Sequence, residues 1–514
     1  MKTLILGLNF IPRKGEGALA LGPYYLKSYH DYACNKAGGE VLIRQFSVTD
    51  PDEQIVSEIV SLEPDIVGFG LYVWNTQKAK ILARSLKERM DSVKIVWGGP
   101  EASALAEQML LGNPCVDVIV RGEGEITFSE LLSGGLRQES LSGIQGITYR
   151  QAGAVINNPA RPLINNLGSI PSPFLNNAFE FSNEYNVVHF ESSRGCIYSC
   201  GFCSWTSKGL RDYPLERVFK ELDIILRDNT VKGVCFCDSN ILFNKKRAKE
   251  ILSFLRGNNH QSKPIFFELN AEYLDEEIID LMKQLKMHVF SFGIQSVNEA
   301  ALKRMNRRFN RQRFQANLEM LKKKTGNSYI SFDLIYGLPD DTLDGFRGSI
   351  DYALSFKPNN ISFFPLLVLP GSEFFSAPDK YGLTLQEGVP HRVLYTDKFS
   401  AQDMNAAGKI GLFVRIISKY RVLREYFYFL SRHIYKDKVR TKYLEPYEGF
   451  LRFIEEKTKI LELKSGFYDL APSTSSDNED LEALRSRLKA SKFKLIFYLV
   501  LFSVGQIWKN LRSS

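Results

Sequence analysis

The sequence predicts an α/β protein made of two successive strand–helix series followed by a mostly α-helical region. Short apolar strands alternate with amphipathic helices over residues 1–135, and a second such series covers residues 187–375. After residue 376 only helical patterns recur. Such alternation is typical of parallel sheets, either doubly wound or closed as barrels. We therefore expect a doubly wound, Rossmann-like domain (1–135), a connector (136–186), a partial (β/α)6 TIM-like barrel (187–375) and a helical cap and tail (376–514).

Composition limits the class of protein. The chain has 514 residues, a formal net charge of +8 and seven cysteines, an odd number. Its basic residues are interspersed with acidic ones, which does not favour a nucleic-acid partner. Residues 1–10 lack the apolar length and cleavage site of a signal peptide, so we expect a reduced, cytoplasmic compartment.

The first domain carries glycines where its strands end. The expected strands are 3–7, 40–43, 66–70, 94–99 and 116–120, and the expected helices are 23–37, 51–62, 76–90 and 102–110. Doubly wound sheets bind ligands at the carboxyl ends of their strands, and glycine there permits close backbone approach. For any single glycine, simple turn chemistry is the alternative. The residues at these ends are Gly7, Asn9, Tyr72, Val73, Trp74, Asn75, Thr76, Gly98, Gly99, Pro100, Gly122, Glu123 and Gly124.

The connector is expected to hold a small hairpin, with strands at 147–150 and 154–156. The proline-rich stretch 170–174 that follows reads as an extended link.

A cysteine triplet opens the second series. Cys196, Cys200 and Cys203 form a C-x3-C-x2-C pattern directly after an apolar strand that begins at Val187, and Phe202 precedes the last cysteine. Cysteine thiolates are the usual ligands of iron–sulfur clusters. Three ligands for four irons leave one iron open to a small molecule. The alternative, a structural zinc site, usually requires four ligands, and no further pair of ligands lies nearby in the sequence.

The later strands of this series also end in polar residues. The expected strands are 233–238, 264–270, 288–293, 329–334 and 361–365, and the expected helices are 214–227, 244–256, 275–284, 311–324 and 344–356. Barrel chemistry lies at the C-terminal strand ends, so we expect these ends to converge beside the triplet. The polar candidates there are Asp238, Ser239, Asn240, Glu268, Gln295, Ser296 and Asp333. Alone, each carboxylate would be read as a helix cap or a surface ion pair, and Cys235 and Cys237 are read as core.

With these motifs the chain resembles the radical S-adenosylmethionine (SAM) enzymes. The triplet resembles their cluster loop, and G-I-Q-S at 293–296, D-L-I-Y-G-L-P at 333–339 and L-P-G-S at 369–372 resemble segments after their fourth, fifth and sixth strands. The resemblance implies that the three cysteines hold a [4Fe–4S] cluster and that SAM caps its open iron. It also implies that Phe202 and the polar candidates contact SAM, with a contact to the substrate as the alternative for Asp333 or Glu268. An external donor such as flavodoxin or ferredoxin would supply electrons.

The first domain resembles the cobalamin-binding domain of one large radical SAM subclass. The segments that carry this likeness are D-I-V-G-F-G at 65–70, W-G-G-P-E-A-S at 97–103 and R-G-E-G-E at 121–125. The resemblance implies cobalamin at the strand-end residues given above. The D-x-H-x-x-G motif is absent, and His30, the domain's one histidine, falls in the first expected helix. We therefore expect no histidine below the cobalt. A domain that has lost its cofactor is the alternative.

The resemblance implies hydrogen abstraction by a 5′-deoxyadenosyl radical and methylation of an unactivated carbon, or of phosphorus, in a small-molecule or natural-product substrate. Rearrangement, cyclisation or coupling, with or without cobalamin, is one alternative. A non-catalytic metal-binding adaptor is another.

The C-terminal region is expected to be helical at 408–419 and 426–435, exposed at 473–478 and helical again at 481–489. Residues 493–508 are mostly apolar with lysines at their edges. We favour a helix that packs on the body of the protein. The alternative is an interfacial anchor that would make the protein membrane-peripheral.

Overall fold

The computed structural model describes residues 1–457 except 10–18, 35–38, 183–184, 206–208, 286, 288, 327 and 436–441. The expected segments 473–478, 481–489 and 493–508 lie outside the described residues. The chain divides into two compact units. Unit 1 comprises Met1–Met287 with Leu369–Ser376, and unit 2 comprises His288–Val368 and the chain from Ala377.

Unit 1 begins with a seven-stranded sheet in the order β2-β1-β3-β4-β5-β6-β7. Its strands are β1 (Lys2–Asn9), β2 (Glu40–Ser47), β3 (Ile66–Gly70), β4 (Lys94–Gly98), β5 (Val118–Val120), β6 (Ile147–Gln151) and β7 (Ala154–Asn157). The first five are parallel, which confirms the doubly wound prediction. The hairpin expected in the connector, β6–β7, continues this sheet antiparallel to β5, because Ile147 and Tyr149 are buried in the domain core.

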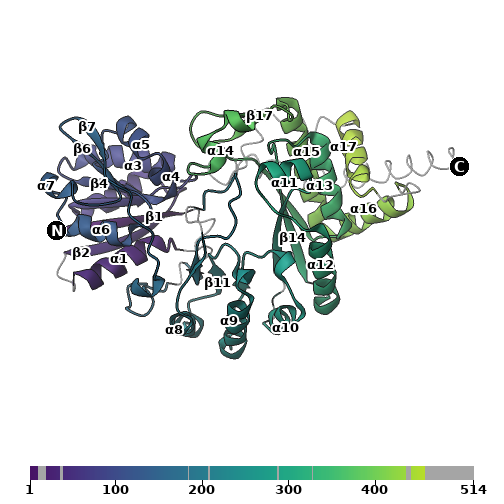
Figure 1. Ribbon diagram of the computed structural model, residues 1–514, viewed down its shortest axis with the longest axis horizontal. Helices are drawn as coiled ribbons and strands as arrows, with labels where there is room; N and C mark the ends of the chain where they lie inside the picture. Colours follow the sequence, from purple (N-terminus) through teal and green to yellow (C-terminus); the bar gives the residue numbers. More distant parts are fainter. Residues whose placement is uncertain are drawn as a thin grey trace. The chain divides into compact units, whose positions relative to one another are not determined.

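Helices cover both faces of this sheet (Figure 1). They are α1 (Gly22–Ala33), α2 (Asp52–Ser61), α3 (Thr76–Arg89), α4 (Gly99–Ala104), α5 (Ala106–Gly112), α6 (Gly124–Ser133) and α7 (Gln138–Leu141). Successive residues of β1 point to opposite faces. Leu4 and Leu6 pack with α2, α3 and α5, whereas Ile5 packs with α6. This two-sided burial explains why the parallel strands are continuously apolar.

The rest of unit 1 holds a three-stranded parallel sheet in the order β12-β11-β8. Its strands are β8 (Val187–Phe190), β11 (Gly233–Phe236) and β12 (Ile265–Phe266), and its helices are α8 (Leu215–Arg227), α9 (Lys245–Asn258) and α10 (Glu276–Gln284). Two short strands, β9 (Ser193–Arg194) and β10 (Arg211–Asp212), pair antiparallel around the cysteine triplet. The short helix α14 (Glu373–Ser376) also belongs to this unit.

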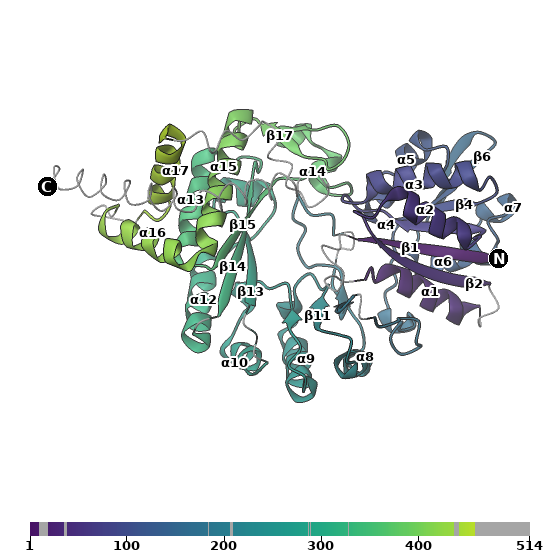
Figure 2. The same ribbon diagram turned by 180° about the vertical axis from the view of Figure 1, so that it is seen from behind.

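Unit 2 holds a second three-stranded parallel sheet, with β14 between β13 and β15 (Figure 2). Its strands are β13 (Val289–Gln295), β14 (Tyr329–Tyr336) and β15 (Asn360–Pro365), and its helices are α11 (Glu299–Arg304), α12 (Arg311–Thr325) and α13 (Leu343–Ser355). The six parallel strands of the second series thus follow the predicted order, three in each unit. Helix α11 was not predicted.

The C-terminal part of unit 2 is helical, as predicted, but its boundaries differ. The helices are α15 (Ala401–Lys419), α16 (Arg421–His433) and α17 (Glu445–Lys457), and a hairpin of β16 (Leu383–Leu385) and β17 (Val393–Thr396) precedes them. Helix α15 begins earlier than expected because Ser400 and Asp403 form a capping box. None of the described helices is both long and apolar enough to cross a membrane.

Candidate active site

The three cysteines of the triplet lie on one tight loop that β9 leads into. The Tyr198 N–H points at Cys196 Sγ at 3.4 Å, and the Cys203 N–H donates to the Cys200 carbonyl at 3.0 Å. Cys200 is buried, Cys196 is half-buried and Cys203 is exposed. The loop therefore presents three thiols that differ in solvent access, and a backbone N–H is directed at one of the sulfurs.

The three thiols do not converge on one metal-ion position. Among the described residues, no three Cys, His, Asp or Glu side chains converge closely enough to hold one metal ion. A cubane is different, because each cysteine binds a separate iron and the ligand sulfurs stand further apart. Burial raises the pKa of Cys235 and of Cys237, which keeps both as neutral thiols and agrees with their assignment to the core.

A segment distant in sequence braces this loop. The Phe374 N–H donates to the Gly201 carbonyl at 2.9 Å, and a Cβ on Gly201 would lie 2.4 Å from the Phe374 ring. Only glycine permits this approach. The L-P-G-S segment that leads into α14 therefore belongs to the surroundings of the cysteine loop within unit 1.

Asp238 and Ser239 hold the backbone around the triplet, and Asn240 caps the turn that follows them. The Asp238 carboxylate is buried and accepts the Ser192 N–H at 3.0 Å, the Ser192 hydroxyl at 2.7 Å and the Ser193 hydroxyl. The Ser239 hydroxyl donates to the Gly195 carbonyl at 2.7 Å, and the Asn240 side chain accepts the Leu242 N–H. The Asp238 and Ser239 side chains thus position the cysteine loop. The expected contact of all three residues with SAM stays a prediction.

Glu268 differs from this group. It follows β12 and its side chain remains reachable by solvent, yet desolvation by the surrounding chain raises its pKa. A solvent-accessible carboxylate suits hydrogen bonding to a polar ligand. Phe202 is half-buried on the cysteine loop.

In unit 2, the G-I-Q-S segment separates its two polar residues. Gln295 has φ +66°, an uncommon conformation for a residue with a side chain, and its amide nitrogen would lie 2.5 Å from a Cβ on Gly293. Ser296 is instead fully buried, with its hydroxyl 3.5 Å from Asp341 and 3.4 Å from the Ser349 hydroxyl. Asp333, on β14, is half-buried. Strained residues cluster at functional sites, which favours Gln295 over Ser296 as a ligand-facing group.

The N-terminal domain of unit 1 contains a cavity of about 220 Å³ where β1, β3, β4 and β5 end. Of the residues predicted to bind there, the lining includes Gly7, Asn9, Tyr72, Gly98, Gly99, Gly122, Glu123 and Gly124. Apolar residues Ile5, Val96 and Phe128 continue the wall into the domain. Gly99 is required, because φ is +86° and a Cβ would lie 2.7 Å from the Leu71 carbonyl oxygen. A lining of glycine backbone and apolar side chains, with charged groups at Glu123, Glu125 and Arg194, allows an organic ligand to approach the main chain closely.

The other five predicted residues do not line this cavity. Asn75 is buried and donates to the carbonyls of Leu8 and Gly70 at 3.0 and 2.9 Å, so it fastens the loop after β3. The Thr76 hydroxyl donates to the Tyr72 carbonyl. Trp74 stacks on Tyr72 with ring centroids 4.4 Å apart. Val73 and Pro100 are half-buried beside them.

No histidine is among the described residues that line the cavity. His30 lies on α1 instead, where it is 1% exposed and its Nδ1 is 3.2 Å from the Ser129 hydroxyl. That no histidine lies below a bound cobalt stays a prediction.

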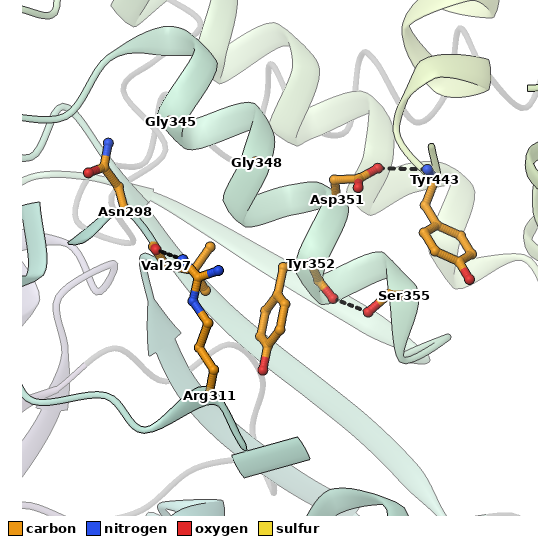
Figure 3. Close-up of a pocket in the computed structure, with 9 residues that line it drawn as sticks. All are labelled: Val297, Asn298, Arg311, Gly345, Gly348, Asp351, Tyr352, Ser355 and Tyr443. Atoms are coloured by element: carbon orange, nitrogen blue, oxygen red, sulfur yellow. Dashed lines mark hydrogen bonds between the residues drawn. The ribbon is translucent and has the colours of Figure 1, made fainter. Parts of the chain in front are cut away.

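Unit 2 has a second cavity, of about 540 Å³, between α12, α13 and the segment that precedes α17 (Figure 3). It is lined by Val297, Asn298, Arg311, Gly345, Gly348, Asp351, Tyr352, Ser355 and Tyr443. The Arg311 side chain donates to the Val297 carbonyl, and Asp351 accepts the Tyr443 N–H at 2.6 Å. Sequence reasoning did not identify this cavity, whose polar groups contact one another.

Sequence reasoning also missed the arginine that joins the two halves of unit 1. Arg194, two residues before Cys196, lines the glycine-rich cavity together with Tyr25, Glu123 and Glu125. The only signals available were the arginine in R-G-C and the acidic R-G-E-G-E segment, and nothing in the sequence indicated that they pair.

Comparison with known proteins finds two family domains in this chain. The family model of the B12 binding domain matches residues 27–132, and that of the radical SAM superfamily matches residues 190–353. An uncharacterized methyltransferase of Pyrococcus horikoshii is 30% identical over 329 residues, which are 62% of this chain and 71% of that protein.

The cobalamin-dependent radical SAM methyltransferase TokK of Streptomyces tokunonensis is 27% identical over 79% of this chain. The match spans 60% of that relative's length. Among solved structures, TsrM of Kitasatospora setae, a radical SAM methyltransferase with tryptophan substrate and a SAM analogue bound, superposes with a TM-score of 0.59. It shares 15% identity over 79% of this chain and 82% of its own, which shows a common fold.

Proposed function

The chain belongs to the radical SAM enzymes that carry a B12-binding domain, and from this membership we propose that it methylates an unactivated carbon, or phosphorus, of a small-molecule or natural-product substrate. The cofactors of this enzyme class are a [4Fe–4S] cluster, SAM and cobalamin. One observation carries the proposal. A thiol triplet and a glycine-lined cavity adjoin within one compact unit, with Arg194 in the cavity wall and Cys196 two residues later.

When bound, the cluster supplies the electron that cleaves SAM to a 5′-deoxyadenosyl radical, and cobalamin supplies a methyl group. The protein supplies binding, orientation and exclusion of water. Cys196, Cys200 and Cys203 would hold the cluster, and Glu268 would hydrogen-bond the SAM ribose hydroxyls. The glycines of the N-terminal cavity would admit the corrin ring close to the backbone.

A small-molecule substrate is supported by the tryptophan in the similar TsrM structure. We further propose an external electron donor such as flavodoxin or ferredoxin. The interfacial role considered for residues 493–508 stays a prediction, because these residues lie outside the described part of the chain.

The test is anaerobic reconstitution with iron, sulfide and hydroxocobalamin. The reconstituted protein is then reduced in the presence of SAM, which is the probe. We expect iron–sulfur and corrinoid absorption together with release of 5′-deoxyadenosine. Absence of the corrinoid bands alone would favour the cofactor-free domain. Absence of 5′-deoxyadenosine from a protein that retains its cluster would favour the adaptor and refute the enzyme.

A further inference from the structure

Arg194 lies at the centre of a buried ion-pair network between the cysteine loop and the R-G-E-G-E loop. Its guanidinium nitrogens lie 2.7 Å from Glu125 Oε1, 2.9 Å from Glu191 Oε2 and 3.5 Å from Glu123 Oε1. The Arg194 and Glu125 side chains are only 13% and 5% exposed. Glu123 and Glu125 come from the start of α6 in the N-terminal domain, whereas Arg194 belongs to β9. The network therefore joins the two halves of unit 1.

A second arginine completes it. Arg211, on β10, stands directly opposite Arg194 in the β9–β10 pair. Like charges facing each other across strands destabilise a sheet unless an anion lies between them. Glu123 provides that anion, because it accepts two hydrogen bonds from Arg211, at 2.7 and 3.0 Å, and one from the Ile164 N–H at 2.8 Å.

Aromatic rings fix the plane of the Arg194 guanidinium. Its central carbon lies 5.2 Å from the Tyr25 ring centroid and 5.8 Å from that of Tyr213, and the two rings stack 6.2 Å apart. The residue is thus a permanent cation held in one orientation.

This network forms part of the cavity wall. Arg194, Glu123, Glu125 and Tyr25 all line the glycine-rich cavity, and Gly195 and Cys196 follow Arg194 directly. We propose that Arg194 is a positioning residue that locks the first cysteine of the cluster loop to the R-G-E-G-E loop and so sets the spacing between the cluster and cobalamin. The inference rests on the proposed function. A displacement of about 1 Å can cost on the order of 10²-fold in rate, so this spacing matters.

The test uses the reconstituted holoenzyme and the variants Arg194→Lys and Glu125→Gln. Lysine keeps the charge but loses the planar fork that reaches three carboxylates. Glu130→Gln is the control, because Glu130 lies on the same helix and pairs with Arg161 but does not line the cavity. The readouts are the distance between the unpaired electrons of cob(II)alamin and the reduced cluster, measured by pulsed electron paramagnetic resonance, and 5′-deoxyadenosine release.

We expect Arg194→Lys and Glu125→Gln to retain both cofactors and to lengthen or broaden the interspin distance, while Glu130→Gln matches the wild type. Unchanged distances in both test variants would overturn the proposal and leave the proposed function intact. A wild-type protein without corrinoid bands would instead overturn the proposed cobalamin function, and with it the spacing.

Amide hydrogen exchange then tests the lock without either cofactor. Exchange that rises together in segments 193–205 and 122–126 of Arg194→Lys supports the lock. A rise confined to 193–205 overturns it.

Discussion

Two sets of strand ends in this protein differ in the residues that they present to a ligand. In the N-terminal sheet, glycines lie at or near the ends of β1, β3, β4 and β5, and backbone atoms line the cavity there. In the three-stranded sheet of the same unit, β8, β11 and β12 lead to cysteines, Asp238 and Glu268. In the first region, glycines leave space next to the backbone for a ligand. In the second region, thiol and carboxylate side chains provide the reactive groups. A parallel sheet offers both choices at the same topological position.

The two regions also differ in where strain and desolvation are concentrated. Around the cavity the demanding feature is backbone conformation, as at Gly99. At the side-chain-rich strand ends of the two three-stranded sheets, the demanding features are buried polar groups, such as Asp238 in unit 1 and Asp341 in unit 2, and the conformation of Gln295 in unit 2. Substitutions in the two regions should therefore reduce stability or activity for different physical reasons. Four predictions test this difference.

The largest effect is expected at the thiols. Cys200→Ala should abolish 5′-deoxyadenosine release, because the remaining two thiols cannot hold a cubane that keeps one iron open. The measurements are the iron content of the variant and its 5′-deoxyadenosine release, detected by mass spectrometry. Cys115→Ala is the control, since Cys115 packs beside the N-terminal core and should leave release unchanged. Full release from Cys200→Ala would refute the cluster assignment.

The second largest effect is expected at Gly99, whose backbone lines the N-terminal cavity. Gly99→Ala should lower the free energy of unfolding by about 3 kcal/mol, because it adds a strained conformation to an overlap with Leu71. Urea denaturation measures this, and retention of hydroxocobalamin should fall with it. Gly122→Ala is the matched variant, with φ +78° but no atom within 4 Å of the new Cβ. It should cost only about 1–2 kcal/mol. Equal losses in both variants would contradict the close approach at Gly99.

A pH effect of similar size is expected in unit 2. Burial raises the pKa of Asp341 to about 6, against hydrogen bonds from the Thr342 N–H, Asn298 and Ser296 that lower it. Because an unfolded aspartate titrates near about 3.9, the folded state binds the extra proton between about pH 4 and pH 6. This contribution to stability is therefore full below about pH 4 and is lost as the pH rises to 6.

The loss should approach about 3 kcal/mol over that interval. Urea midpoints measured across this pH range should show the slope in the wild type, superimposed on the titration of other groups. Asp341→Asn should remove this component. An identical slope in the variant would show that Asp341 titrates normally.

The smallest effect is expected at Gln295. Gln295→Gly should stabilise unit 2 by about 1 kcal/mol, because glycine adopts φ +66° without strain. SAM binding, measured by equilibrium dialysis, should weaken at the same time. Gln295→Asn, which keeps an amide and tolerates this conformation, is the control. A glycine variant that is less stable than the wild type would indicate that the Gln295 side chain is structural.

The sequence alone determined the local features. The apolar alternation predicted both parallel series, because the core requires apolar residues wherever a helix covers a strand. The C-x3-C-x2-C spacing predicted the thiol loop, because the ligands of a cluster loop lie close together in the chain. Helix boundaries were less exact, as at α15, where the capping box at Ser400 sets the start.

Only the tertiary structure decided which strand-end residues line the cavity and which hold the fold. Asn75 and Ser296 are polar residues at strand ends like Asn9 and Gln295, yet their side chains turn inward to backbone or buried hydroxyls. The pairing of Arg194 with Glu123 and Glu125, and the packing of Phe374 on Gly201, join residues about 70 and more than 170 positions apart. Sequence patterns report periodicity within a segment, whereas such contacts depend on how distant segments pack, and that is settled only when the chain has folded.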